Sequence, residues 1–369
     1  MISKQNQKGG DNSTNVQAEQ LVINMGIDEK RAREIYQEMN LQLKKEYSQE
    51  ALEVANSRVM EFENSLMSKM DAVDGAMQAF ADPSFQLLLV EAQKRAAATE
   101  RTADYELLSE LLIHRFQKGE DRTIRAGISR AVDIVDEISD EALLGMTVAH
   151  SISAFMPTAG DINVGLDVLN DLFGKLLYKS LPSGSEWLDH LEVLSAVRLN
   201  SLGGMKKINQ YYPESFSGYV DVGIKKESED HTKAIEILSQ HNLPLNLLIE
   251  HSLNKEFVRL SVIARNQIGS ISLRQRFVNN GQVFEIPIPL SAQQVQAVES
   301  IYDLYDKDAN LKQQNINVFM NEWDRRSNLY TVKLWWDSID TLFQLTSVGK
   351  VLAHSNAQRC DKKLPPLKT

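Results

Sequence analysis

Apolar residues recur at helical spacing along most of this chain, and the first long stretch of them follows a polar leader. From Glu29 to about Met70, steps of three and four residues separate the apolar positions, which places them on one stripe of a helix. Asp28 is suited to cap that helix, and Gly26 to interrupt the chain before it. The pattern predicts one N-terminal helix of about 40 residues, about 60 Å long. Either the helices that follow or a second chain must cover its apolar stripe.

Shorter helices with short loops between them are expected after this one. Most begin beside a Ser, Thr, Asp or Pro, which are favoured at helix N-termini. No fixed-period repeat is present, which argues against a regular solenoid. We therefore expect a mainly α protein, a multi-helix bundle or array. The expected helices cover residues 83–99, 102–116, 121–138, 140–156, 161–177, 185–199, 231–240, 244–268, 291–305 and 347–358.

The pattern becomes less regular beyond about Gly203. Residues 211–218 are aromatic and irregular, which indicates a junction. Residues 282–289 alternate apolar and polar positions and contain two prolines, which predicts an edge strand or an extended connector. A short apolar run at 342–345 precedes Thr346, a good helix cap, and this order is typical of the end of a winged-helix-like module. The chain thus divides into a leader (1–25), a helical body (26–210) and a mostly helical C-terminal module with little β structure (211–369).

The leader differs in composition from everything after it. Asn, Gln, Ser and Gly dominate residues 4–24, and a short apolar tip stands at 21–23. Such a segment cannot bury a core of its own, but Asn and Gln side chains can pair with copies of themselves in β-ladders between chains. We interpret it as a conditional pairing segment, with a passive disordered tail as the alternative. Its candidate interaction residues are Asp11, Asn12, Ser13, Asn15, Gln17, Val22 and Ile23.

Charge and composition narrow the class of protein. The formal net charge of -10 opposes non-specific attraction to nucleic acid or anionic lipid. The single cysteine, Cys360, excludes an internal disulfide framework and is compatible with a reducing compartment. No apolar run reaches the roughly 18 residues that a membrane span needs, and the N-terminus lacks the apolar region of a secretory signal. We expect a cytoplasmic protein without a membrane span.

A search for chemistry in the sequence finds no catalytic motif. No phosphate loop, nucleophile elbow, zinc-protease or dinucleotide-binding pattern occurs. Residues 306–310 have the oxygen spacing of a calcium loop, but Leu311 replaces the required glycine and Asn317 the bidentate glutamate. The seven histidines are scattered over separate helices. We therefore expect no enzymatic activity, no cofactor and no metal, although a catalytic site assembled from distant helices needs no motif and stays open.

Four stretches of the chain resemble an uncharacterised family of bacterial helical proteins. They are residues 7–27, 83–86, 209–216 and 345–356. No activity is attached to that family. The G-D-N-S-x-N-x-Q-A leader at residues 10–18 is also similar to leaders of bacterial signalling and antiviral-defence proteins, some of which are thought to serve as assembly tags.

The resemblance implies an interaction or signalling protein, in phage defence or stress response, that binds a protein partner or a second copy of itself. The alternative is a nucleic-acid-associated regulator that uses the winged-helix-like C-terminal module. In that alternative, basic side chains of the module lie near phosphates and binding weakens steeply with salt. The candidate phosphate contacts are Arg274, Arg276, Lys350 and Arg359.

Overall fold

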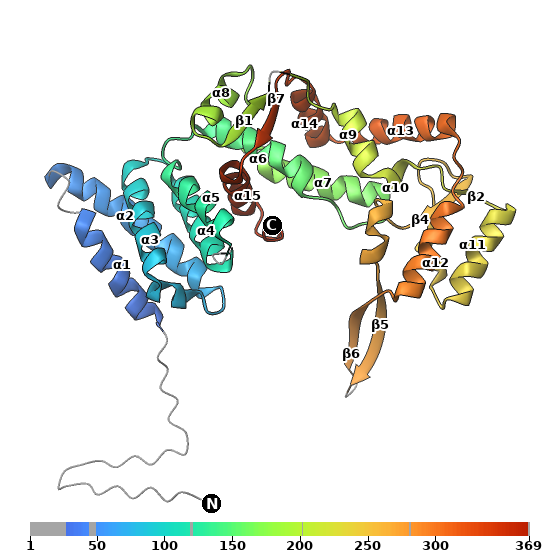
Figure 1. Cartoon of the computed structure of the whole chain (residues 1–369), viewed down its shortest axis with the longest axis horizontal. Coiled ribbons are helices and arrows are strands. Elements are labelled where there is room, and N and C mark those ends of the chain that lie inside the picture. Colours follow the sequence, from blue (N-terminus) through green and yellow to red (C-terminus); the bar gives the residue numbers. More distant parts are fainter. Residues whose placement is uncertain (1–26, 44–48, 119–120, 201, 280–281, 368–369) are drawn as a thin grey trace, which may run out of the picture.

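Helices account for most of the computed structural model, which describes residues 27–43, 49–118, 121–200, 202–279 and 282–367. Over these residues the chain forms fifteen α-helices, three short 3-10 helices and seven strands, which confirms the expected mainly α fold. Figure 1 shows them arranged as an arch. Helices α1–α5 make one end, α6, α7, α8 and α15 with the strands β1 and β7 the middle, and α11, α12 and the strands β2, β4, β5 and β6 the other end.

The helices begin where the sequence supplies caps. Asp82, Asp121, Ser139, Asp161 and Thr346 each accept a hydrogen bond from a backbone N–H of the first turn that follows. The α-helices of the first half are α1 (Glu29–Leu43), α2 (Gln49–Asp71), α3 (Pro83–Ala98), α4 (Thr102–Lys118), α5 (Arg122–Asp133), α6 (Asp140–Ala154), α7 (Ile162–Leu176) and α8 (Glu186–Val193). Those of the second half are α9 (Ile208–Ser215), α10 (Ser217–Val220), α11 (Glu229–Gln240), α12 (Ala292–Asp303), α13 (Ala309–Asp324), α14 (Ser327–Asp337) and α15 (Ser347–Cys360).

The prediction of a single N-terminal helix from residue 29 to about residue 70 is wrong. The structure has two helices, α1 and α2, which lie against each other. The Tyr36 hydroxyl donates a 2.8 Å hydrogen bond to the carbonyl of Val59, and Arg33 pairs with Glu63 at 3.1 Å. Residues 23 apart would be separated by about 35 Å in one straight helix. The apolar stripe is therefore covered within the chain, where α1 and α2 pack against each other and against α3, and α2 also packs against α4.

The strands form three small antiparallel sheets. β1 (Val197–Asn200) pairs with β7 (Leu342–Leu345), and β4 (Phe257–Leu260) lies between β2 (Ile224–Lys225) and β3 (Leu248–Glu250). β5 (Ser272–Asn279) and β6 (Gln282–Pro289) form a hairpin that projects from the arch. β6 confirms the strand expected over 282–289.

Two expected helices contain strands instead. The segment 244–268 forms β3, β4 and the 3-10 helices η2 (Leu245–Leu247) and η3 (Arg265–Ser270). All four residues of β4 are buried, and spacing alone cannot distinguish such a short buried strand from a helix. The segment 185–199 leaves the helix at Val193, passes Ser195 with a left-handed φ of 59°, and continues as β1.

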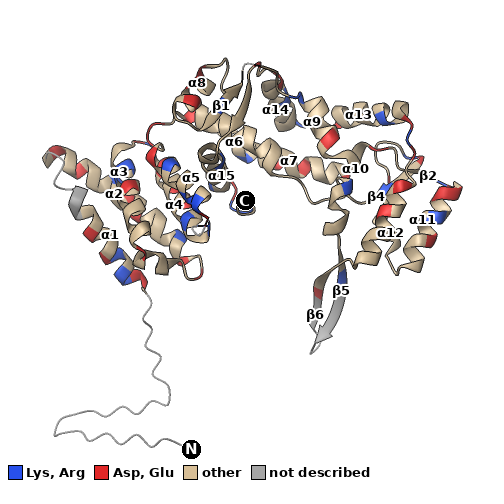
Figure 2. Ribbon diagram, in the orientation of Figure 1, with Lys and Arg blue, Asp and Glu red and all other residues tan. Residues whose placement is uncertain are grey.

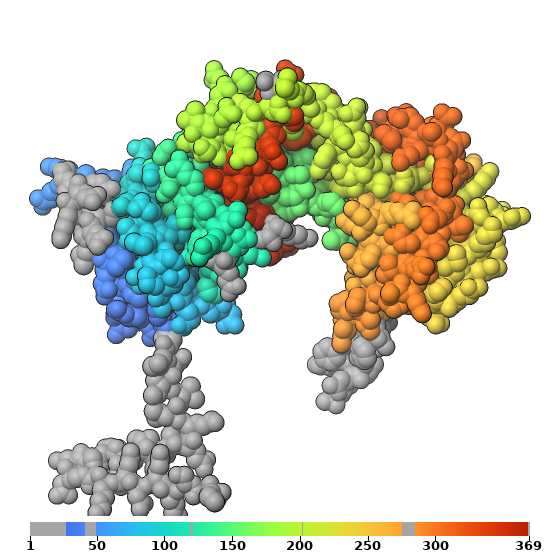
Figure 3. Space-filling model, viewed as in Figure 1, coloured from blue at the N-terminus to red at the C-terminus, as the bar shows by residue number. Residues whose placement is uncertain are grey.

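Buried side chains of the described residues form two hydrophobic cores. The large core takes residues from α1 to α10 and again from α13, α14 and α15. The small core lies within residues 224–305, here called the small module. Figure 3 shows the hollow face between this module and the N-terminal helices. In Figure 2 acidic and basic residues are interspersed along the helices.

The C-terminal helix does not belong to a separate winged-helix-like module. β7 pairs with β1 of the helical body, and α15 packs against α4, α5 and α6. Residues Val348, Gly349 and 351–357 of α15 are buried. A recognition helix must present its side chains to a groove of DNA, and α15 is enclosed by the large core instead.

Candidate functional site

Three histidines from distant parts of the chain meet inside the large core. His114 comes from α4, His150 from α6 and His354 from α15, and each is at most 5% exposed. His150 Nε2 lies 3.2 Å from His354 Nδ1, and the rings of His114 and His354 are 5.8 Å apart. Phe155 packs against both His150 and His354. We call these three residues the histidine cluster.

Hydrogen bonds fix the tautomer of each histidine. The carbonyl of Pro365 can only accept, so His354 Nε2 donates to it at 2.9 Å and His354 Nδ1 is left as an acceptor. His150 Nε2 therefore donates to His354 Nδ1. The Gln358 amide donates to the carbonyls of Leu364 and Pro365, so its oxygen accepts from His114 Nε2 at 2.7 Å.

The cluster is held electrically neutral. Burial lowers the pKa of His150 to about 3 and that of His354 to about 4, and Lys350 adds a smaller lowering effect on the pKa of His150. Burial likewise lowers the pKa of His114, against the opposing effect of its hydrogen bond to Gln358. His150 and His354 therefore form a directional chain of hydrogen bonds that ends at the Pro365 carbonyl, and His114 packs beside it without a bond to either ring.

The register of α15 on α6 brings His354 to His150. Asn356 of α15 donates a 2.9 Å hydrogen bond to the Thr147 hydroxyl, which itself bonds the Leu143 carbonyl one turn earlier in α6. Gly349 lies so close to the Ala196 carbonyl and the Met146 sulfur that a side chain there would collide with the backbone. The two helices are therefore locked at both ends of their contact.

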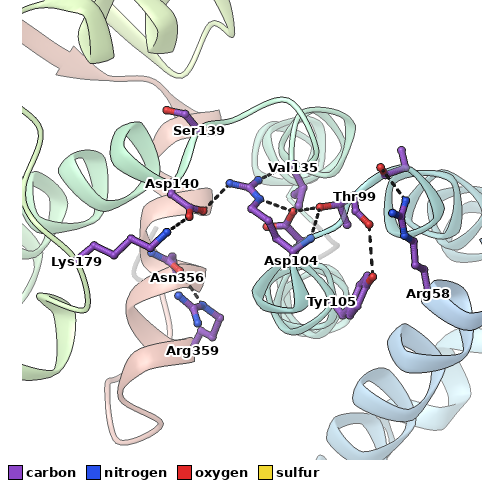
Figure 4. A network of polar contacts seen from close by, with 12 residues as sticks. Arg58, Thr99, Asp104, Tyr105, Val135, Ser139, Asp140, Lys179, Asn356 and Arg359 are labelled. Carbon is purple, nitrogen blue, oxygen red and sulfur yellow. Dashed lines mark hydrogen bonds and ion pairs between the residues drawn. The ribbon is translucent and has the colours of Figure 1, made fainter. Parts of the chain in front are cut away.

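A polar network centred on Arg101 anchors the start of α6. Its guanidinium contacts Asp104 and Asp140, each at 2.9 Å, and the Val135 carbonyl at 2.7 Å. Figure 4 shows Asp104, Val135 and Asp140 converging, with Lys179 reaching Asp140 from the opposite side. Asp104 is buried and receives a further 2.5 Å bond from Thr99. The network ties α4, α6 and the loop after α7 together.

A cavity of about 860 Å³ opens beside the histidine cluster. His150 and His354 line it, together with α7, the start of α15 and the C-terminal residues 363–367. Phe155, Leu169 and Leu172 supply an apolar wall. Its charged lining residues are Lys175, Lys350, Lys363, Asp171 and Asp361.

A second cavity of about 1010 Å³ continues the first one into the small module. Both are lined by Thr158, Gln267 and Ser270, so together they form one depression, here called the groove. The second cavity holds hydroxyl and amide side chains and one cation, Arg274, and no Asp or Glu lines it.

A buried arginine joins the two cores behind the groove. Arg259 of β4 is 0% exposed and donates to the carbonyls of Gly218, Leu260 and Val262 at 2.9–3.1 Å, and also to that of Gly160. Its guanidinium lies over the Tyr219 ring. Among the described residues no carboxylate forms an ion pair with it, and burial lowers its pKa.

The sequence-predicted sites have mixed outcomes. The leader residues 11–23 lie outside the described residues, as does the side chain of Arg276. Arg274 and Lys350 line the two cavities of the groove. Arg359 does not face the groove: it bonds Asn356 at 2.9 Å and lies over the Tyr178 ring. Of the described basic candidates, Arg274 and Lys350 therefore line the groove, and their contact with phosphates stays a prediction.

Other residues considered from the sequence have structural roles. Asp308 of the calcium-like stretch caps α13. Burial raises the pKa of the Cys360 thiol, which opposes the reactive thiolate form. Over the residues that the structure describes, no group of three or more His, Cys, Asp or Glu is arranged to hold a metal ion. Nor does any helix in those ranges have the length and apolarity to cross a membrane.

Sequence reasoning missed the histidine cluster and Arg259. His150 stands in an apolar stretch beside the polar residues Thr147 and Ser151, which indicates internal partners, but nothing in the sequence points to His354, 204 positions away. Arg259 stands within the otherwise apolar run Phe257–Leu260, which was assigned to a helix. An arginine inside a short apolar run is the signal that could have revealed it.

Comparison with known proteins gives one match. A model of an uncharacterised protein family matches residues 26–365. No curated protein and no solved structure matches the chain significantly.

Proposed function

The chain belongs to that uncharacterised family, and we propose that it is a non-enzymatic bacterial interaction or signalling protein. The helical body binds a ligand or partner in the groove, and the leader mediates self-association. The resemblance of the leader to those of antiviral-defence proteins favours a role in phage defence or stress response.

One observation carries this proposal. The two cavities share Thr158, Gln267 and Ser270, and so the groove runs from the large core to the small module. A bound molecule would contact both, and its binding energy would favour one relative position of the two. Such a change in the body can be passed to the leader, which gains intermolecular strands when it orders.

Mass measurement of two forms of the protein tests self-association. The full chain, of 41.7 kDa per copy, is expected to form a multiple of that mass, and a chain lacking residues 1–24 is expected to stay a monomer. A full-length variant with Asn12, Asn15 and Gln17 changed to Ala should behave like the shortened chain. The matched control changes Lys4 and Lys8 to Ala in the same leader. Equal masses for the full and shortened chains would contradict the proposal.

The second candidate is a nucleic-acid-associated regulator. It is supported by the position of Arg274 and Lys350 in the same groove. Retention on heparin or DNA at low salt, lost as salt rises, is the expected behaviour. Changing both residues to Gln should abolish retention, whereas Arg359→Gln should not. No retention at low salt removes this candidate.

A further inference from the structure

We propose that the groove binds a phosphate-bearing small molecule of nucleotide size. This inference rests on the proposed function, because it names the ligand class of the same groove. Four properties of the groove support it: its charge, its unpaired polar side chains, the buried arginine behind it and its apolar wall.

The groove carries a surplus of positive charge in an acidic protein. Its lining contains Arg274, Lys175, Lys350 and Lys363 against two carboxylates, whereas the whole chain has a net charge of -10. Arg274 is 82% exposed and pairs with Glu285, outside the lining, at 3.5 Å. Asp361 is already paired with Lys175 at 2.8 Å. Neither Lys350 nor Lys363 forms an ion pair with a described carboxylate. Both ammonium groups are free to meet an anion.

Polar side chains without protein partners surround the second cavity. None of their side-chain groups makes a hydrogen bond within the described parts of the chain, so each can serve a ligand. They are hydroxyls and carboxamides, which suit phosphate and sugar oxygens. They are Thr158, Ser261, Ser270, Ser272, Asn242, Asn246 and Gln267.

Arg259 adds a fixed positive charge behind the cavity wall. Two of the carbonyls that it binds belong to Gly160 and Val262, and both of these residues line the second cavity. Because the partners of Arg259 are carbonyl groups rather than carboxylates, they stabilise the guanidinium charge by hydrogen bonds but do not neutralise it. In a partly buried site such a charge raises the local potential and favours an anionic ligand.

The neighbouring cavity offers room and apolar surface for the rest of the ligand. Phe155, Met156 and Leu169 lie on its wall, next to the basic side chain of Lys350. Cavities of about 300–1,000 Å³ are the usual size for small-molecule sites. A planar apolar group on this wall with a phosphate toward Lys350 and Arg274 would use both halves of the groove.

Titration calorimetry on the full chain tests the inference. The probes are the four ribonucleoside 5′-monophosphates, their triphosphates, the uncharged nucleosides, inorganic phosphate and a single-stranded oligonucleotide. We expect at least one nucleotide to bind, and its nucleoside to bind at least tenfold more weakly. Lys350→Gln and Arg274→Gln, both at exposed positions, should each weaken binding about tenfold. Lys233→Gln, on α11 outside the groove, should leave it unchanged.

The possible failures are distinguishable. Absence of binding by every nucleotide, equal binding of nucleosides, or unchanged affinity in both groove variants overturns the inference. Binding of the oligonucleotide alone overturns it in favour of nucleic acid. If the inference fails while deletion of the leader still dissociates the protein, the proposed self-association stands and only the ligand class is wrong.

Discussion

His150 donates from Nε2 to His354 Nδ1 across 3.2 Å, and this bond exists only while His354 is neutral, because a proton on Nδ1 would remove the acceptor. The ordinary pKa of histidine is 6.5, whereas burial holds that of His354 at about 4. Between pH 6.5 and about 4 the unfolded chain binds a proton that the folded chain does not. Stability is therefore fully present above pH 6.5 and falls as the pH drops toward 4.

We expect acidification over this range to cost about 3 kcal/mol of stability from His354 alone. Urea unfolding at pH 7.0 and pH 4.5 measures the loss. The variant His354→Gln keeps a donor to the Pro365 carbonyl but cannot bind a proton. Its free energy of unfolding should therefore fall by less than that of the wild type between these two pH values, with most of the roughly 3 kcal/mol absent. His241→Gln, a half-buried histidine of the small module, serves as the control. An equal drop in wild type and His354→Gln would contradict the prediction.

Gly349 of α15 lies in close contact with the backbone at Ala196 and with the Met146 side chain. Changing a helical glycine to alanine ordinarily stabilises a protein by up to about 1 kcal/mol. Here the added methyl group would meet the Ala196 carbonyl and the Met146 sulfur, so we expect Gly349→Ala to destabilise by about 1–3 kcal/mol. Gly204→Ala, in a loop with open space around it, controls for the added methyl group without a collision. Thermal unfolding that shows no difference between the two variants would refute this packing.

Features that depend on local chemistry, such as helix caps and the strand of the hairpin, can be predicted from the sequence. Caps such as Asp121, Asp161, Ser291 and Thr346 were readable because a side chain and a backbone donor lie within one turn. The strand at 282–289 was readable from its period of two. The fold-back between α1 and α2 was not, because an apolar stripe shows which face is buried but not which helix covers it.

The groove and the histidine cluster depend on tertiary contacts. His114 and Ser355 are 241 positions apart and still meet at 3.0 Å. Each of these residues reads as an ordinary polar position in its own helix. Arg274 and Lys350 were selected for charge alone, and only the fold brings their cavities together. Long-range convergence of this kind leaves no periodic signal in the chain.

Arg101 compensates the buried carboxylate of Asp104. Burial already raises the pKa of Asp104, and its side chain is 2% exposed. Arg101→Met removes the positive partner and should destabilise the protein by about 3 kcal/mol. Adding Asp104→Asn removes the unpaired charge, so the double variant should recover part of that loss of stability.

The control variant, Arg130→Met, breaks a half-exposed ion pair with Asp133 and should cost less than about 1 kcal/mol. Additive losses in the double variant, measured by urea unfolding, would argue against this compensation.

Arg259 connects the small module to the large core through backbone carbonyls, so its loss should uncouple their unfolding. Arg259→Met leaves those carbonyls without a charged donor, at a cost of about 3 kcal/mol. Trp187, Trp323, Trp335 and Trp336 all belong to the large core, and the small module has no tryptophan. Tryptophan fluorescence therefore reports the large core, and far-UV circular dichroism reports both.

In urea we expect Arg259→Met to lose circular dichroism before its fluorescence changes, because the module unfolds first. Arg325→Met, at a site 73% exposed, should leave both transitions as in the wild type. If the two signals of Arg259→Met still change together at an unaltered midpoint, the buried guanidinium does not couple the cores. Coupling would then have to come from other contacts, such as the 2.5 Å hydrogen bond from the Tyr302 hydroxyl of the small module to Asp221, which follows α10.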